Sequence, residues 1–517
     1  DMFASGDPMM MEKEEGRRWN KAINEGGQAS VDAALEIITT FSQGKMPWKT
    51  NDPDLMKPVW HQTIEAAEKF NEPGKFTAFI GYEWTSLLKG NNLHRVVIYK
   101  DGGNEARQTL PFTLEDSADP ERLWDAMQAY EEKTGGDLLA IPHNGNLANG
   151  IMFDVETLSG KPIDKDYASR RQQWEPLYES TQIKGDGEAH PFLSPDDEFA
   201  DYETWDLGNL DMSASKTDDM LAGEYARSGL KRGLEFEQKL GVNPYKFGQI
   251  GSTDSHTSLP AVEENNFFGK HSGVEPSPER ASHVVIGGEN GKIMGHQMAS
   301  SGYAAVWAKE NTRQSIFDAM ARKETYATTG SRMAVRFFGG WDFSEADANS
   351  RQPAEAGYSR GVPMGGNLSQ APDGKSPTFL VAAMKDAMSG NLDRIQIIKG
   401  WVGKDGKAQE RVYDVAVSDD RKIDKNGRCK TPVGNTVDVA NATWTNTIGD
   451  PELISVWTDP DFDAKQNAFY YVRVLEIPTP RWTAYEAKRF NIKMPKDTEM
   501  VTQERAYTSP IWYTPKS

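Results

Sequence analysis

The hydrophobic period changes once along this 517-residue chain, near residue 340. Before that point, short apolar runs alternate with longer segments in which apolar residues recur at helical spacing. After it, short alternating segments follow one another, Gly, Asp, Asn and Pro separate them, and helical signals are scarce. A chain of this length is expected to form two or three domains. The change therefore predicts an α/β domain over residues 1–339 and an all-β, sandwich-like domain over residues 340–517.

The first of these domains shows strands and helices in alternation. We expect strands in 75–84, 94–100, 137–146, 175–183 and 245–256, helices in 28–44, 56–74, 118–136 and 218–241, and a loop, a helix and a strand within 305–328. Alternation of this kind indicates βα units and a mostly parallel barrel or sheet.

The composition excludes several classes of protein. The net charge of −19 argues against nucleic acid as a partner, because phosphate binding needs a basic surface. No run of about 18 apolar residues is present, so no transmembrane segment is expected. The single cysteine excludes an internal disulfide. The sequence contains neither the glycine-flanked serine of the α/β-hydrolases nor a P-loop.

Five residues of metal-ligating type follow or precede predicted strands. They are Glu83, His94, His143, Asp254 and His256. In parallel βα folds the carboxyl ends of the strands meet on one face, where active sites lie. Imidazole and carboxylate ligands together suit Zn, Mn or Fe, and such an ion generates hydroxide near neutral pH. On an extended segment, residues two apart point to the same side, so Asp254 and His256 are expected to reach one ion.

Each of these residues also has an ordinary structural interpretation. A histidine after a strand often bonds a backbone carbonyl, a glutamate such as Glu83 can be the partner of a buried cation, and Asp-Ser-His can form a turn. The joint pattern is what predicts a metal site. We expect Glu83, His143, Asp254 and His256 to carry the catalysis as well, although His143 or His256 would serve as a proton donor if it did not bind metal.

The same motifs resemble a known superfamily. The order strand–Glu, His, Pro-His and Asp-x-His resembles the later metal motifs of the PHP (polymerase and histidinol phosphatase) superfamily. The segments FIGYEWTS, NLHR, IPHNGN, GSTDSHTS and EENNFFGK, with the tail IPTPRW…QERAYTSPIWYTP, look like a large bacterial PHP-like family labelled only as a domain of unknown function. The resemblance implies a distorted seven-stranded βα barrel, a (βα)7 fold. It also implies two or three divalent ions (Mn, Zn or Fe) held by the five residues above.

One feature of that superfamily is missing. Its members begin with His-x-His on the first strand, whereas the only histidine before Glu83 in this chain is His61, inside a predicted helix. Together with the start at Asp1, this suggests a chain trimmed at its N-terminus; a natural chain with an incomplete site is the alternative. Relatives of this type often look exported, which favours a periplasmic or secreted protein and leaves a cytoplasmic one open.

Four further residues are candidates for holding the substrate. Arg95 and Lys184 could bind an anionic group, and Asn144 and Asn146 could line the pocket; salt bridges and turns are the structural alternatives. Glu179, Gln182 and Glu188 lie near Lys184, at a polar strand end that we expect to meet the site. The remaining histidines are expected at the surface: His190, His271, His283 and His296.

The function that these expectations favour is metal-dependent hydrolysis of a small phosphoester or related anionic ester by metal-activated hydroxide. PHP-like centres resemble those of amidohydrolases, so carboxylic esters, lactones and amides stay open. A third reading is a binding or scaffold protein that has lost its chemistry, which the absence of His-x-His favours and the five remaining ligands oppose.

Overall fold

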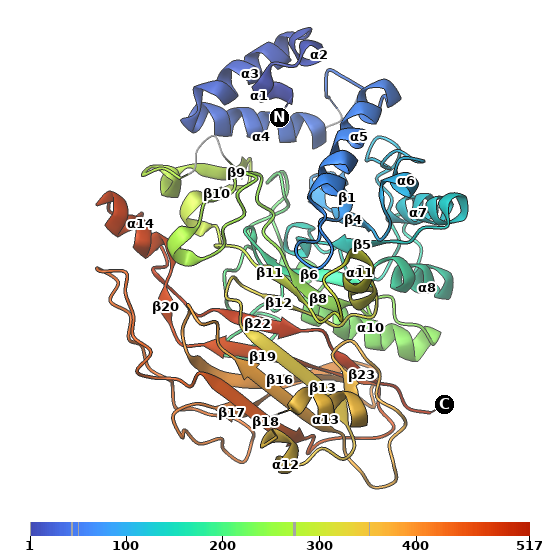
Figure 1. Cartoon of the computed structure of the whole chain (residues 1–517), viewed down its shortest axis with the longest axis vertical. Helices are drawn as coiled ribbons and strands as arrows, with labels where there is room; N and C mark the ends of the chain where they lie inside the picture. Colours follow the sequence, from blue (N-terminus) through green and yellow to red (C-terminus); the bar gives the residue numbers. More distant parts are fainter. Residues whose placement is uncertain (1, 43–44, 50, 272–275, 351, 517) are drawn as a thin grey trace.

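The computed structural model describes residues 2–42, 45–49, 51–271, 276–350 and 352–516 (Figure 1). It is a mixed α/β protein with several antiparallel sheets. Five helices come first. The cluster at the top of Figure 1 consists of α1 (Met2–Ser5), α2 (Pro8–Met11), α3 (Glu14–Glu25) and α4 (Gly27–Ser42). The fifth helix, α5 (Pro53–Phe70), follows them. The helices predicted in 28–44 and 56–74 are thus confirmed as α4 and α5.

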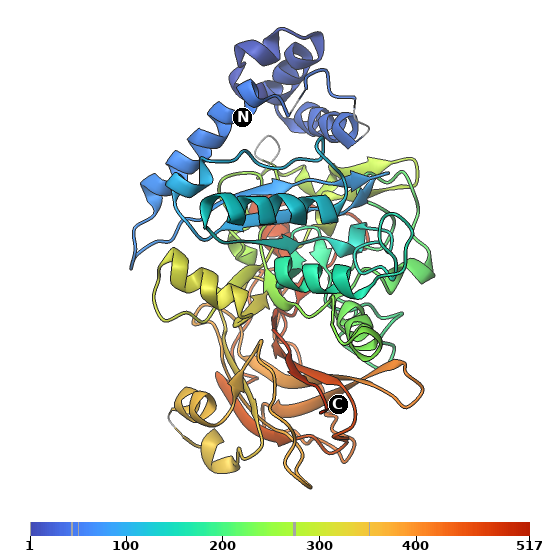
Figure 2. The same ribbon diagram turned by 90° about the vertical axis from the view of Figure 1, so that its right-hand side faces the viewer.

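A three-stranded sheet follows, in the order β1-β4-β5. Its strands are β1 (Ile80–Trp84), β4 (Arg95–Tyr99) and β5 (Leu138–Pro142), and a small hairpin of β2 (Leu87–Leu88) and β3 (Asn91–Asn92) stands between β1 and β4. Side chains of α5 and of α7 (Pro120–Thr134), among them Ile64, Trp124 and Met127, share one apolar cluster with this sheet. In Figure 2, α7 lies in front of this sheet.

The next part of the chain forms a second three-stranded sheet, in the order β7-β6-β8. Its strands are β6 (Leu177–Gln182), β7 (Gly185–Asp186) and β8 (Gly248–Gly251). The helices of this part of the chain are α8 (Lys165–Trp174), α9 (Asp218–Leu221) and α10 (Ala226–Leu240), whereas the short α6 (Gly103–Ala106) lies earlier in the chain, beside α5. The single helix expected over 218–241 is therefore two helices, α9 and α10.

The prediction of mostly parallel strands is wrong for the described residues. Among their named strands, β6 and β8 are the one parallel pair, and β1, β4 and β5 pair antiparallel. The alternation of strands and helices is present, but the connections from β1 to β4 and from β4 to β5 bring each strand back in the reverse direction. A helix in a connection permits a parallel crossover without requiring one.

The C-terminal part is built mainly from two antiparallel sheets. One has four strands, in the order β14-β13-β15-β18: β14 (Val362–Pro363), β13 (Ala334–Gly340), β15 (Thr378–Met384) and β18 (Glu452–Thr458). The other has seven: β11 (Tyr303–Val306), β12 (Thr325–Thr328), β22 (Arg505–Thr508), β19 (Ala468–Glu476), β16 (Leu392–Val402), β17 (Ala408–Val417) and, beside β19, β23 (Ile511–Tyr513).

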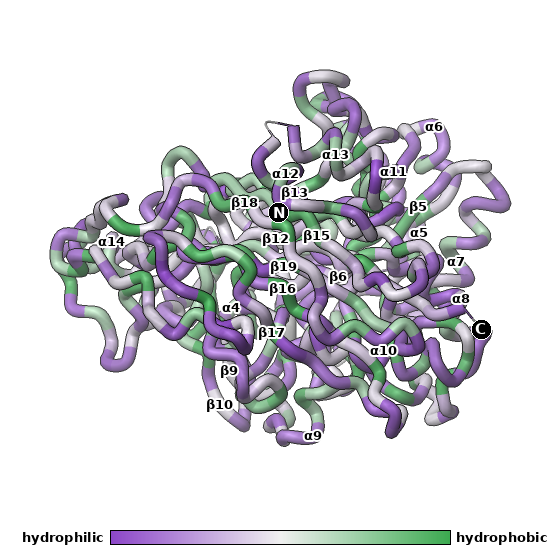
Figure 3. Tube along the Cα trace, turned by 90° about the horizontal axis from the view of Figure 1, so that it is seen from below, coloured by the Kyte–Doolittle hydropathy of each residue, from purple (hydrophilic) through white to green (hydrophobic). Residues whose placement is uncertain are grey.

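Side chains of both sheets form one apolar cluster, in which Phe337 and Phe379 of the smaller sheet join Ile397 and Tyr470 of the larger. Such packing of inward-facing residues is typical of a β-sandwich. The larger sheet also contains β11 and β12, which precede residue 340 in sequence. In Figure 3, hydrophobic stretches run through the middle of the molecule and hydrophilic ones are frequent at its edges.

The smaller elements complete the fold. They are the hairpin β9 (Val284–Gly288) with β10 (Gly291–Met294), the pair β20 (Thr479–Pro480) with β21 (Val501–Thr502), and the helices α11 (Arg313–Ala321), α12 (Glu345–Ala348), α13 (Pro353–Arg360) and α14 (Trp482–Phe490). Within the described ranges, none of the helices combines the length and apolar character needed to span a membrane.

A buried ion-pair network joins the middle of the chain to the large C-terminal sheet. Arg227 of α10 contacts Glu188 at 2.7 Å, Asp197 at 2.8 Å and Glu410 of β17 at 3.1 Å. Arg473 of β19 contacts Glu188 at 3.3 Å and Asp197 at 2.6 Å. The side chains of both arginines are at most 1% exposed. Two arginines therefore share two carboxylates where the parts of the molecule meet.

A buried carboxyl group in the large sheet gives a prediction for stability against pH. Burial raises the pKa of Glu476 from 4.5 to about 7, although the hydroxyls of Ser331 and Ser389 donate to it. The folded state thus favours the protonated form, so this contribution is complete below pH 4.5 and is lost as the pH rises through 7.

Replacing Glu476 with Gln keeps the group neutral at every pH. We expect the stability of wild type relative to Glu476→Gln to fall by roughly 3 kcal/mol between about pH 4 and pH 8. Urea unfolding at both pH values measures the difference. Parallel pH dependence of the two proteins would contradict the raised pKa.

Candidate metal centre

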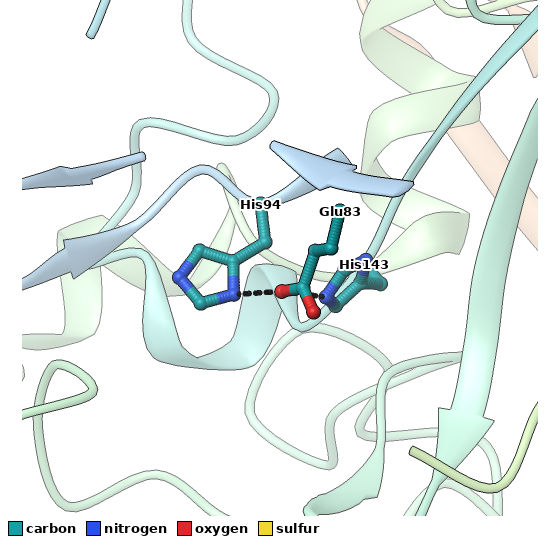
Figure 4. Close-up of side chains that lie close together, drawn as sticks. All are labelled: Glu83, His94 and His143. Atoms are coloured by element: carbon teal, nitrogen blue, oxygen red, sulfur yellow. Dashed lines mark ion pairs between the residues drawn. The ribbon is translucent and has the colours of Figure 1, made fainter. Parts of the chain in front are cut away.

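Three of the predicted ligands lie together. Glu83 Oε1 is 2.7 Å from His94 Nδ1 and 3.4 Å from His143 Nε2 (Figure 4). One ligand atom from each residue lies within 4.8 Å of the others, which makes the three a group that could hold a metal ion. The histidine side chains are 9% and 4% exposed, and that of Glu83 is 35% exposed. Two imidazole nitrogens and a carboxylate oxygen suit Zn, Mn or Fe.

The antiparallel sheet explains why these residues meet. Trp84 of β1 pairs with Arg95 of β4, and Arg95 pairs with Pro142 of β5. The end of β1, the start of β4 and the end of β5 therefore share one edge. His94 precedes β4 and His143 follows β5, and the His143 N–H donates to the His94 carbonyl at 3.3 Å. The ligands therefore lie where ends of strands meet, but β4 takes part with its amino end, whereas β1 and β5 take part with their carboxyl ends.

Asn92 fixes the backbone of this edge, and sequence reasoning missed it. Its Oδ1 accepts from the His94 N–H at 2.8 Å, and its Nδ2 donates to the carbonyls of His143 at 3.3 Å and Asn144 at 3.2 Å. The side chain is fully buried. The sequence signal was an amide residue two positions before a candidate ligand, a spacing at which Asn commonly bonds the backbone.

The protonation of the cluster follows from its burial and contacts. Desolvation works to raise the pKa of Glu83, but hydrogen bonds with His143 and His94 outweigh it and hold that pKa well below 4.5. Burial lowers the pKa of His94 to about 4, against the opposing effect of Glu83. Glu83 is therefore ionised and His94 neutral near pH 7, which are the protonation states that ligands need.

The second nitrogen of each ring is also informative. His94 Nε2 and His143 Nδ1 are buried and have no hydrogen-bond partner within the described part of the chain. In each ring, the nitrogen that faces Glu83 is thus the better place for a proton, because the carboxylate can accept it. A cation bound by the nitrogens that face Glu83 would require each ring to carry its proton on the opposite nitrogen.

Asp254 and His256 lie outside this group of three. Asp254 has a φ of 48°, so the segment is not extended there and the extended backbone expected for Asp254 and His256 is wrong. His256 is 51% exposed, and its Nδ1 lies 3.8 Å from Asp254 Oδ1 and 3.0 Å from Lys270 Nζ. Lys270, followed by burial and Lys184, lowers the pKa of His256 to about 3.

Lysines surround the Asp254 carboxylate instead. Lys184 contacts Asp254 Oδ2, and Lys270 lies 2.9 Å from the same oxygen. Burial and the neighbouring Lys270 lower the pKa of Lys184, while the carboxylates of Glu83 and Glu179 work to raise it. Lys184 was predicted near the site, whereas Lys270 was missed: it ends the segment EENNFFGK, 14 residues after His256, and no predicted strand placed that segment beside the site.

Arg95 does not reach the centre, which corrects the expectation that it binds substrate. Its side chain is 1% exposed, its Nε lies 3.0 Å from Glu175 Oε1, and Nη1 donates to the Leu93 carbonyl at 2.6 Å. Neighbouring residues of an extended segment point to opposite sides. Because His94 faces the centre, Arg95 faces the core beside α8.

The two predicted pocket asparagines are engaged with the neighbouring sheet. Asn144 Oδ1 accepts from Gln182 Nε2 at 2.8 Å, and Asn146 Nδ2 donates to the Lys184 carbonyl at 3.0 Å. Both side chains are buried. They connect the loop after His143 to the end of β6, and so place Gln182 and Lys184 next to the cluster.

The two glutamates that were expected near the site, Glu179 and Glu188, lie in different surroundings. Glu179 is buried beside Ser252, and its Oε1 has no hydrogen-bond partner in the described structure. Glu188 belongs to the Arg227 network, away from the centre. His190, expected at the surface, is 6% exposed and lies 3.3 Å from Asp206, so that expectation is wrong.

Comparison with known proteins gives a family without an assigned activity. No curated protein and no solved structure matches the chain. One family model, described as a protein of unknown function (DUF3604), matches residues 1–515. That match extends over both the metal-ligand cluster and the C-terminal sheets, and the chain therefore belongs to the DUF3604 family.

Proposed function

We propose that the protein is a metal-dependent hydrolase whose ion is held by Glu83, His94 and His143. The observation that carries the proposal is that three ligand atoms lie within 4.8 Å of one another. They come from separate segments of the chain, and the first and last of these residues, Glu83 and His143, are 60 positions apart in sequence. A carboxylate that is ionised and an imidazole that is neutral near pH 7 fit a divalent cation. When bound, such an ion lowers the pKa of a water ligand and supplies hydroxide.

The chain's own residues would then orient the substrate. Lys184 and Lys270 place positive charge next to the cluster, which favours an anionic substrate such as a phosphoester. His256 is half exposed, so a substrate can reach it. With the resemblance of the motifs, these features support membership of the PHP superfamily and a distorted (βα)7 barrel with two or three ions. In that arrangement Asp254 and His256 complete the ligand set.

The test compares hydrolysis by metal-loaded wild type and by Glu83→Gln. The panel contains a phosphomonoester, a phosphodiester, a carboxylic ester and a lactone, each with Mn, Zn or Fe. We expect wild type to hydrolyse a phosphoester and Glu83→Gln to show no turnover above the metal-free level. Glu72→Gln, at a side chain that is 62% exposed in the pair with Lys75, is the matched control.

Other outcomes of the panel separate the alternatives. Turnover of the carboxylic ester or lactone alone would replace the phosphoesterase with an amidohydrolase-like activity. An absence of turnover with every substrate and metal, in a folded protein that binds metal, would reject the hydrolase in favour of a binding or scaffold role.

A further inference from the structure

The buried side-chain amide of Gln182, the last residue of β6, joins the candidate metal centre to Asp254. Its Nε2 donates to Asn144 Oδ1 and to Asp254 Oδ2, both at 2.8 Å. Its Oε1 accepts from the Lys184 N–H at 2.7 Å. Asn144 directly follows His143, one of the three residues of the candidate metal group. Both N–H groups and the oxygen of the Gln182 amide therefore have partners, and only 1% of the residue is exposed.

These partners allow one orientation of the Gln182 amide. Turned over, it would direct its oxygen at two acceptors, Asn144 Oδ1 and the Asp254 carboxylate, and its NH2 group at the Lys184 N–H. Two asparagines close a ring of hydrogen bonds around it, because Asn144 Nδ2 donates to Asn146 Oδ1 at 3.4 Å and Asn146 Nδ2 donates to the Lys184 carbonyl at 3.0 Å. Gln182 is thus fixed by this asparagine loop as well as by its own strand.

The contacts of the Asp254 carboxylate are divided unequally between its two oxygens. Oδ2 is bonded to Gln182 and is also contacted by Lys184 and Lys270. Oδ1 lies 3.8 Å from His256 Nδ1, which is too long for a hydrogen bond. A lysine ammonium group on its flexible chain can follow the carboxylate as it moves, whereas the fixed amide of Gln182 can hold it in one place. Within the described residues, Oδ1 is therefore the oxygen that an ion can take without breaking a contact.

Asp254 lies outside the group of three ligands, and the Gln182 amide links it to that group through the loop after His143. We infer that Gln182 is a positioning residue of the metal centre, which fixes the Asp254 carboxylate relative to the loop after His143 so that Oδ1 can bind metal. Gln182 then touches neither metal nor substrate and acts through Asp254 alone. The inference rests on the proposed function, because it takes Asp254 to be a ligand of that centre.

The experiment is a titration of the metal-free full chain with Co²⁺, whose visible absorption reports on the ligands around the ion. Losing a hydrogen bond to a ligating carboxylate weakens metal affinity by roughly 10- to 100-fold. We therefore expect Gln182→Leu to weaken, by such a factor, the binding of the Co²⁺ that Asp254→Ala also weakens, and to shift the absorption in the same direction as Asp254→Ala does. Gln182→Asn keeps a polar amide in the buried position but is one methylene too short to keep all three hydrogen bonds, so it takes the place of Gln182→Leu if that variant does not fold.

The double variant decides whether Gln182 acts through Asp254. On the Asp254→Ala background, Gln182→Leu should leave the Kd for Co²⁺ and the absorption unchanged, because the carboxylate that Gln182 positions is gone. The inference is overturned if Gln182→Leu leaves the Kd of the otherwise wild-type protein unchanged, if Asp254→Ala itself has no effect, or if Gln182→Leu weakens binding equally with and without Asp254. A residue that only supported the fold would give the last of these results.

Gln396→Leu is the matched control. Gln396 is also a fully buried glutamine whose Nε2 donates to an aspartate, Asp414 Oδ1 at 2.8 Å, but it belongs to β16 of the C-terminal sheet. Its substitution removes a similar hydrogen bond outside the centre and should leave the Kd for Co²⁺ and the absorption as in wild type. An equal weakening in Gln182→Leu and Gln396→Leu would overturn the positioning role.

The outcome is separable from that of the proposed function, because the titration needs no turnover. Co²⁺ binding that depends on Gln182 only when Asp254 is present, in a protein that hydrolyses no substrate, would reject the hydrolase and retain the positioning role. Hydrolysis by wild type with a Kd for Co²⁺ indifferent to Gln182→Leu would reject the positioning role and retain the hydrolase. A wild type that binds no Co²⁺ would reject both.

Discussion

Replacing His143 with Ala should lower the affinity of the protein for Zn or Mn by at least ~100-fold, which corresponds to about 2.7 kcal/mol. His143 is one of three residues that bring ligand atoms within 4.8 Å of one another, and its side chain is 4% exposed. Removing it leaves two of the three ligands in this group, too few to hold the ion of the group firmly against water. Titration of the metal-free protein with a competing chelator measures the two affinities.

His190→Ala provides the control for this prediction. His190 is a buried histidine with one carboxylate neighbour, Asp206, like His143 with Glu83, but it lies outside the group of three. Its metal affinity should equal that of wild type. If His143→Ala binds metal as tightly as His190→Ala does, the ion lies elsewhere and the proposed centre is wrong.

Replacing Arg227 with Met should reduce the free energy of unfolding by about 3–5 kcal/mol. The guanidinium is 1% exposed and contacts Glu188, Asp197 and Glu410. Met fills similar space but leaves these carboxylates without one of their cations inside the protein. Arg473 still contacts Glu188 and Asp197 in the variant, so we expect the protein to remain folded in spite of its lower free energy of unfolding. Urea denaturation followed by circular dichroism gives the difference.

An exposed ion pair offers the contrast. Lys75 and Glu72 form a pair at 2.5 Å whose side chains are 74% and 62% exposed. Lys75→Met should change stability by less than about 1 kcal/mol, because water screens the pair. The double variant Arg227→Met, Glu188→Gln should lose less than the sum of the two single variants, since the unpaired charge is removed. Equal losses for Arg227→Met and Lys75→Met would contradict a stabilising network.

Local patterns predicted the elements that carry the centre. The alternating apolar residues before Glu83 became β1, the buried run before His143 became β5, and the short strand after His94 became β4. These strands are visible in sequence because side-chain alternation and β-branched residues act over a few positions. The same local signals predicted α4, α5 and α7, the latter ending at a left-handed glycine, Gly135.

Other features of the site had no local signal. The direction of β4, which is antiparallel to both neighbours, determines that the beginning of that strand lies next to the ends of β1 and β5. The choice of Glu175 as the partner of Arg95, and of Asp254 as the partner of Lys270, depends on which charged groups become buried together. Such pairings depend on contacts between residues 16 to 80 positions apart, which no periodicity encodes.

The sequence by itself determined which segments are strands and helices and which residues have the chemistry of metal ligands, because both follow from side-chain type and short-range spacing. The tertiary structure alone decided that Glu83, His94 and His143 meet, that Asp254 lies between two lysines, and that Arg95 turns into the core. Strand direction and the pairing of buried charges are set by the packing of the whole molecule, where each buried ion requires a partner.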